Sequence, residues 1–73
     1  GHTLGASGAI ETIVSLEMMK RDTLLPTLNL ETIGEECSGL DHVRSPRECK
    51  IGVFLKSSFA FGGINANLIC SKL

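Results

Sequence analysis

A glycine-containing turn near the carboxyl end is the feature that most constrains this chain. The segment Phe59-Ala60-Phe61-Gly62-Gly63-Ile64-Asn65 lies between two short apolar runs. Two adjacent glycines permit backbone angles that a side chain forbids, so the main chain can turn sharply or approach a ligand closely. Such a turn can also direct amide N–H groups outward. The segment is therefore either a plain hairpin connection or part of a ligand site.

Apolar runs on both sides of this turn predict two short neighbouring strands. Residues 51–57 are rich in strand-forming residues, and residues 66–71 form a second run of the same kind. These strands would bracket residues 58–65 as a long hairpin connection. Two strands are too little sheet to be stable alone.

Residues 3–21 are the best helix candidate. Thr3 is a suitable N-cap, and Lys20 and Arg21 place positive charge at the far end. Pro26 follows beyond the predicted stop. The apolar residues of this segment spread over most of the helix circumference, which is typical of a helix covered on several sides. A chain of 73 residues cannot cover such a helix well.

The middle of the chain, residues 22–50, predicts loops. An alternating run, Leu24–Leu30, indicates an extended segment, which its proline confines to a sheet edge or a connection. Cys37, Asp41 and His42 lie close in sequence, but their spacing matches no metal or nucleophile motif. We therefore expect no metal site.

Composition excludes several classes of protein. Three cysteines without a C-x-x-C spacing favour neither a disulfide framework nor a zinc ribbon, and reduced thiols suit a cytoplasmic location. A net charge of -1 argues against a nucleic-acid partner. No apolar run approaches the roughly 18 residues of a membrane span. A chain that begins at Gly1 and is apolar from its third residue is expected to be a piece of a longer protein.

Two polar groups near the helix start stand out chemically. His2 precedes the helix, where the positive dipole end disfavours a charged imidazole, so a neutral ring could donate one hydrogen bond and accept another. The alternative is a surface histidine at a frayed terminus. Glu11 is the single charge between Thr3 and Leu16. It needs a cation or several donors if it is buried, and otherwise marks the solvent-facing side of the helix.

Three segments together resemble one enzyme family. They are residues 1–11 (GHTLGASGAIE), residues 25–30 (LPTLNL) and residues 57–65 (SSFAFGGIN). In this order they resemble the carboxyl-terminal part of the β-ketoacyl-[acyl carrier protein] synthases, which elongate fatty acids and polyketides. The resemblance implies an α/β fold, α+β for the isolated fragment, made of the last helix and last two antiparallel strands of a thiolase-like αβαβα arrangement. Residues 1–73 would belong to its second half.

The resemblance also implies roles for individual residues. His2 would hydrogen-bond the carbonyl of a malonyl-carrier thioester during decarboxylation, and Glu11 would pair with a lysine upstream of Gly1. The backbone N–H of Phe61 would be one donor of the oxyanion hole, and its ring would form a gate to the acyl pocket. Gly62 and Gly63 would permit the turn, and Phe59 would help wall the site.

The implied nucleophile is an upstream cysteine, so Cys37, Cys49 and Cys70 would not serve and the fragment alone would be inactive. The usual family pattern has threonine at Ile64 and asparagine at Ser57, and often glycine at Ala60. These departures leave the chain-length preference open and allow a specialised synthase.

The implied function is a decarboxylating Claisen condensation that joins an acyl thioester to malonyl-[acyl carrier protein]. Its partners would be acyl carrier protein and the acyl and malonyl thioesters, with a homodimer as the parent protein. No cofactor is expected beyond the phosphopantetheine that carries the substrates. Two alternatives stay open: a non-catalytic synthase-like subunit of the chain-length-factor type, and a small structural or interaction domain.

Overall fold

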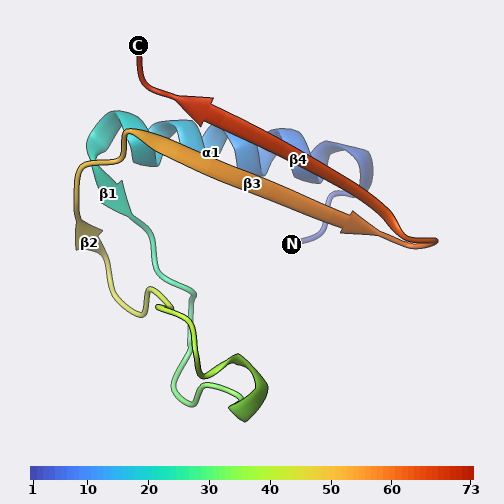
Figure 1. Cartoon of the computed structure of the whole chain (residues 1–73), viewed down its shortest axis with the longest axis horizontal. Coiled ribbons are helices and arrows are strands. Elements are labelled where there is room, and N and C mark those ends of the chain that lie inside the picture. Colours follow the sequence, from blue (N-terminus) through green and yellow to red (C-terminus); the bar gives the residue numbers. More distant parts are fainter.

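One long helix, a β-hairpin and a looped excursion between them make up the chain (Figure 1). The computed structural model describes residues 1–73. Its elements are η1 (Leu4–Ala6, a 3₁₀ turn), α1 (Ser7–Arg21), β1 (Thr23–Leu24), η2 (Glu35–Cys37, a 3₁₀ turn), β2 (Arg47–Glu48), β3 (Val53–Ala60) and β4 (Ile64–Ser71). The helix α1 runs beside the hairpin and contacts β3. The chain is thus mixed α/β with antiparallel strands, as predicted.

The helix α1 follows directly on η1, so the predicted helix is confirmed. Thr3 stands at the predicted N-cap, but its φ of -110° and ψ of 32° are not those of a capping residue, and its side chain makes no cap hydrogen bond. At the other end, Asp22 adopts a left-handed backbone and donates its N–H to the carbonyl oxygens of Met18 and Met19. These bonds close the last helical turn.

The strands β3 and β4 of the hairpin are longer than predicted, and the turn between them is shorter. Its antiparallel register runs from Val53 opposite Ser71 to Ala60 opposite Ile64. Only residues 61–63 connect the strands, so the prediction of a connection over residues 58–65 was wrong. The physical reason is that Gly62 and Gly63 both take positive φ values, 81° and 79°, which lets the strands pair up to the turn itself.

The predicted loop region contains a short ladder that sequence patterns missed. β1 and β2 pair antiparallel, with Thr23 opposite Glu48 and Leu24 opposite Arg47. This ladder closes residues 25–46 into an excursion away from the helix and hairpin (Figure 1). Two-residue strands carry no periodicity, so only the tertiary pairing of distant segments reveals them.

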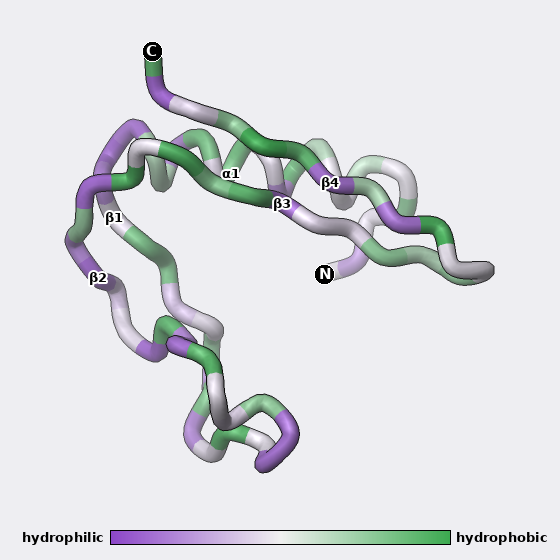
Figure 2. Tube along the Cα trace, viewed as in Figure 1, coloured by the Kyte–Doolittle hydropathy of each residue, from purple (hydrophilic) through white to green (hydrophobic).

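The chain buries almost no core of its own. Met19 is the single buried residue, and large apolar side chains such as Ile13, Leu55 and Ile69 are more than half exposed. A folded protein of 7.8 kDa is expected to expose about 4400 Å², whereas this chain exposes 6200 Å². Figure 2 shows hydrophobic stretches, in green, along α1, β3 and β4. As predicted, the chain leaves most of the apolar surface of its helix exposed.

None of the helices combines the length and apolar character that crossing a membrane requires.

Candidate functional site

The two ends of the sequence meet in one groove of about 430 Å³. The start of the chain and the first turns of α1 form one wall, and the second half of β3 forms the other. Its lining residues are His2, Leu4, Ser7, Gly8, Glu11, Ser57, Ser58, Phe59 and Ala60. Three of the predicted site residues, His2, Glu11 and Phe59, are thus brought together although they come from opposite ends of the sequence.

His2 is held in this groove through one ring nitrogen. Its Nδ1 lies 3.1 Å from the hydroxyl oxygen of Ser7, and its Nε2 has no hydrogen-bond partner in the chain. Leu4, between these two residues, has a φ of 51°. A left-handed backbone costs a residue with a Cβ about 1–2 kcal/mol, and such strain is often found at functional sites. His2 therefore has one nitrogen engaged and one available.

Glu11 forms an ion pair that sequence reasoning missed. Its Oε1 lies 3.1 Å from Nζ of Lys56 on β3, whose side chain is 12% exposed against 61% for Glu11. The same ammonium group donates to the hydroxyl of Ser58. The sequence indicated that a buried Glu11 would need a cation as its partner. Nothing in the sequence spacing indicated that Lys56 is that cation. The pair ties α1 to β3 beside His2, and a pair this exposed contributes up to about 1 kcal/mol.

Phe61 stands just beyond the end of the groove. It follows Ala60, which lines the groove, and its own side chain is fully exposed. None of the backbone hydrogen bonds outside the helices and strands uses the Phe61 N–H. This amide therefore keeps a free donor at the tip of the hairpin. Gly62 and Gly63 complete the turn with nothing near their Cα atoms that a Cβ would meet.

Ser57, one of the departures from the family pattern, has a partner across the hairpin. Its hydroxyl donates to Oδ1 of Asn67, 2.6 Å away, and the two residues face each other in the β3–β4 register. This side-chain bond adds a cross-strand contact to the backbone pairing of the groove wall.

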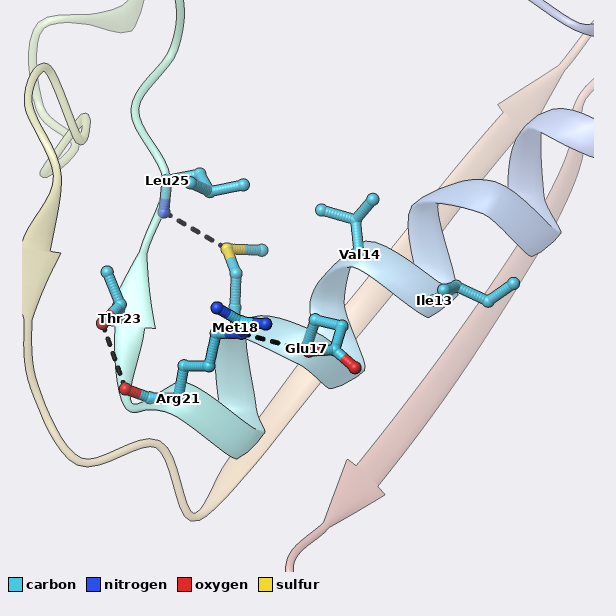
Figure 3. A pocket seen from close by; sticks show the side chains of 7 residues that line it. All are labelled: Ile13, Val14, Glu17, Met18, Arg21, Thr23 and Leu25. Atoms are coloured by element: carbon cyan, nitrogen blue, oxygen red, sulfur yellow. Dashed lines mark hydrogen bonds and ion pairs between the residues drawn. The ribbon is translucent and has the colours of Figure 1, made fainter.

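The second groove, on another part of α1, is larger and mostly apolar. It has a volume of about 650 Å³ and is lined by Ile13, Val14, Glu17, Met18, Arg21, Thr23 and Leu25. Figure 3 shows Val14, Met18 and Leu25 pointing into the same space. Its charged residues, Glu17 and Arg21, pair with each other at 3.2 Å. This groove holds none of the predicted site residues.

The other residues considered in the sequence as possible site residues lie outside both grooves. Asp41 forms a two-point ion pair with Arg47, at 2.8 and 3.1 Å, and this guanidinium lowers the pKa of the Asp41 carboxyl. His42 contacts the carbonyl oxygen of Cys37 through Nε2, at 2.8 Å. The chain contains no cluster of three potential metal ligands. Cys37, Cys49 and Cys70 are free thiols, and none of them lines the groove.

Comparison with known proteins identifies the family. The family model for "Beta-ketoacyl synthase, C-terminal domain" matches residues 1–31. Over its whole length the chain is 45% identical to the 3-oxoacyl-[acyl-carrier-protein] synthase 2 of Coxiella burnetii and 38% identical to the 3-oxoacyl-[acyl-carrier-protein] synthase 1 of Escherichia coli. It is also 41% identical, over 99% of its length, to the 3-oxoacyl-[acyl-carrier-protein] synthase 2 of a Synechocystis species.

This chain belongs to the β-ketoacyl synthase family and corresponds to a carboxyl-terminal segment of it. It spans 18% of the length of the Coxiella and Escherichia relatives and 17% of the Synechocystis one. The predicted family is therefore confirmed, and the roles of individual residues stay predictions.

Proposed function

We propose that the complete protein carrying this chain is a condensing enzyme that joins an acyl thioester to malonyl-[acyl carrier protein] with loss of carbon dioxide. The observation that carries the proposal is the end-to-end similarity to several 3-oxoacyl-[acyl-carrier-protein] synthases. The meeting of His2 with Phe59 and Ala60 in one groove supports it, because the reaction needs a hydrogen-bond donor and a walled acyl site together.

The proposed chemistry begins with decarboxylation. The carbon–carbon bond to the malonyl carboxylate breaks, carbon dioxide leaves, and the electron pair passes to the thioester as an enolate. His2, as a neutral ring, donates a hydrogen bond to the thioester oxygen where this charge develops. The enolate carbon then bonds to the carbonyl carbon of the acyl group, and the cysteine sulfur that held the acyl group leaves as thiolate.

The turn at the tip of the hairpin serves the acyl half of this reaction. The free N–H of Phe61 is one donor for the oxyanion that forms when the acyl carbonyl is attacked. Its ring is the gate to the acyl pocket, Phe59 walls the site, and Gly62 and Gly63 permit the turn. Glu11 supports the site from α1, where it lines the same groove as His2.

The nucleophile lies outside this chain in the proposal, so residues 1–73 alone are inactive. The proposal assigns them to the second half of a thiolase-like αβαβα fold. It places the synthase in the cytoplasm as a homodimer, with acyl carrier protein as its partner. The phosphopantetheine of that carrier holds both substrates, and no further cofactor is required.

The decisive experiment replaces His2 in the complete synthase. His2→Ala should lower malonyl decarboxylation by about 100-fold or more, because a positioned proton donor contributes roughly 10²–10⁴-fold. Transfer of the acyl group to the nucleophile should stay near the wild-type rate. The two half-reactions are measured separately, as carbon dioxide release and as labelled acyl-enzyme.

His42→Ala is the matched control, because it removes the other histidine, which lies outside the groove and contacts Cys37. Unchanged decarboxylation in His2→Ala would reject the role of His2. A wild-type protein that neither decarboxylates nor accepts an acyl group would instead be a non-catalytic synthase-like subunit.

A further inference from the structure

The hydroxyl of Ser7 lies at the centre of a cluster of polar atoms at the start of α1. It lies 3.1 Å from Nδ1 of His2. The backbone N–H of Thr3 donates to it over 2.8 Å, and the hydroxyl of Thr3 lies 3.1 Å away. Ser7 thus contacts the ring of His2 on one side and Thr3 on the other.

One assignment of donors and acceptors satisfies every contact of this cluster. A serine hydroxyl has one proton to donate and two positions that accept. The Thr3 N–H can only donate, so it occupies one accepting position of Ser7. The hydroxyl of Thr3 brings its own proton, which can fill the second accepting position. The single proton of Ser7 is then free for Nδ1 of His2, which is the more basic of its two possible acceptors.

We propose that Ser7 is a positioning residue that fixes the tautomer of His2. By donating to Nδ1, it holds the neutral ring in the form that carries its proton on Nε2, because one nitrogen of a neutral imidazole donates and the other accepts. Nε2 is the nitrogen without a partner in the chain. The inference rests on the proposed function, in which that proton is the donor to the thioester oxygen.

The geometry of the backbone supports this assignment. Leu4 lies between His2 and Ser7 in sequence and has a left-handed φ of 51°. The strained turn accompanies a contact between residues that are five positions apart, at a place where a regular helix would not yet have begun. Glu11, which lines the same groove, is paired with Lys56, and no hydrogen bond joins it to His2.

The test uses the complete synthase carrying this chain, labelled with nitrogen-15 in histidine. Nitrogen NMR at a pH where the ring is neutral reports which nitrogen of His2 bears the proton, and the His2→Ala variant assigns the signals. Wild type should show the proton on Nε2. Ser7→Ala should show a mixture of both tautomers, and Ser7→Thr, which keeps a hydroxyl, should restore the wild-type signals.

Kinetics provide the second measurement. Ser7→Ala should lower kcat of malonyl decarboxylation by about 5-fold, the effect of losing one neutral hydrogen bond of average strength. KM and acyl transfer should not change, because the hydroxyl of Ser7 is occupied by His2 and Thr3 rather than free for the substrate. Ser15→Ala is the matched control, since it removes another hydroxyl from the same helix whose partner is the carbonyl oxygen of Glu11, 2.8 Å away.

Two outcomes would overturn the proposal. One is a wild-type His2 that carries its proton on Nδ1, which would mean that Ser7 accepts from the ring. The other is a Ser7→Ala variant with an unchanged tautomer. Failure of the proposed function has a different signature, because the wild-type protein would then neither decarboxylate malonyl-[acyl carrier protein] nor accept an acyl group. The NMR result decides the role of Ser7 in that case as well, since it does not depend on turnover.

Discussion

At the scale of single residues, the groove is formed by contacts between residues that are far apart in the sequence. Local sequence patterns do not predict such contacts. Glu11 finds its cation on β3, and His2 lies across from Phe59. The sequence singled out both polar residues because each was unusual in its surroundings. The sequence did not indicate that Lys56 is the partner of Glu11, because a lysine in a strand-forming run is an ordinary exposed residue until a helix packs beside it.

Phe61 is the residue whose predicted role can be tested most directly. Phe61→Ala in the complete synthase removes the proposed gate and leaves the backbone N–H in place. We expect acylation of the nucleophile to change by about 10-fold or more, a transition-state difference of about 1.4 kcal/mol or more. Malonyl decarboxylation should change by less than half as much on a logarithmic scale.

Leu28→Ala is a suitable control for this variant. It also removes a large exposed apolar side chain, but from the excursion rather than from the hairpin tip. Equal effects of Phe61→Ala on both half-reactions would argue against a gate, because a gate restricts only the acyl chain.

At the scale of elements, the end of α1 is the point where the parts of this chain are joined. Asp22 ends the helix in a left-handed conformation that aspartate tolerates better than most residues. Its carbonyl oxygen accepts from Cys49, and its carboxylate accepts from the backbone N–H of Ile51 and from Nζ of Lys72, at 3.1 and 3.2 Å. One residue therefore links the end of the helix to the segment between β2 and β3 and to the carboxyl end.

The carboxylate of Asp22 makes this junction sensitive to pH. The hydrogen bond from Ile51, followed by that from Lys72, lowers the pKa of Asp22 below its ordinary value of 3.8. A group with a lowered pKa in the folded state stabilises that state above its unfolded pKa and loses the contribution as pH falls through the folded value. Asp22→Asn should therefore lower the unfolding midpoint of the complete synthase at pH 7, and the difference from wild type should shrink as pH falls below 3.8 through the lowered pKa of Asp22.

This prediction is checked by denaturant unfolding of both proteins between pH 3 and pH 7. Glu17→Gln is the control, because its carboxylate pairs with Arg21 on the exposed side of the same helix. That variant should change stability little at any pH. A deficit of Asp22→Asn that does not shrink at all in the acid range below pH 3.8 would show that the charge of Asp22 has no part in the junction.

At the scale of the whole molecule, the helix and the strands of this chain do not enclose a hydrophobic core. The helix is apolar on several sides and the hairpin is apolar on both faces, but only Met19 is buried. Because hydrophobic burial supplies most of the favourable free energy of folding, an arrangement of this kind is not stable by itself. The cover expected from the family is the remainder of a complete synthase.

The isolated chain should therefore self-associate in solution. Sedimentation velocity at micromolar concentration should show species larger than the 7.8 kDa monomer. Ile13→Glu should reduce the association, because Ile13 lies in the apolar groove on α1 and is 61% exposed. Leu28→Glu places the same charge on the excursion and should have a smaller effect. A monodisperse monomer that melts in one sharp transition would contradict this expectation.

The sequence by itself determined the features that depend on near neighbours. The helix follows from a long proline-free run that ends in Lys20 and Arg21 ahead of Pro26, and the hairpin follows from two strand-forming runs around Gly62 and Gly63. The family followed from three short segments whose residue order is specific. Each of these signals lies within a stretch of sequence, so no knowledge of distant contacts was needed.

Only the tertiary structure decided which distant residues meet. It closed the β1–β2 ladder, shortened the hairpin turn to three residues, paired Glu11 with Lys56, and placed His2 in one groove with Phe59. The physical reason is that these contacts depend on where the helix lies against the strands. That position is set by packing and by single polar contacts between segments, for which local patterns carry no information.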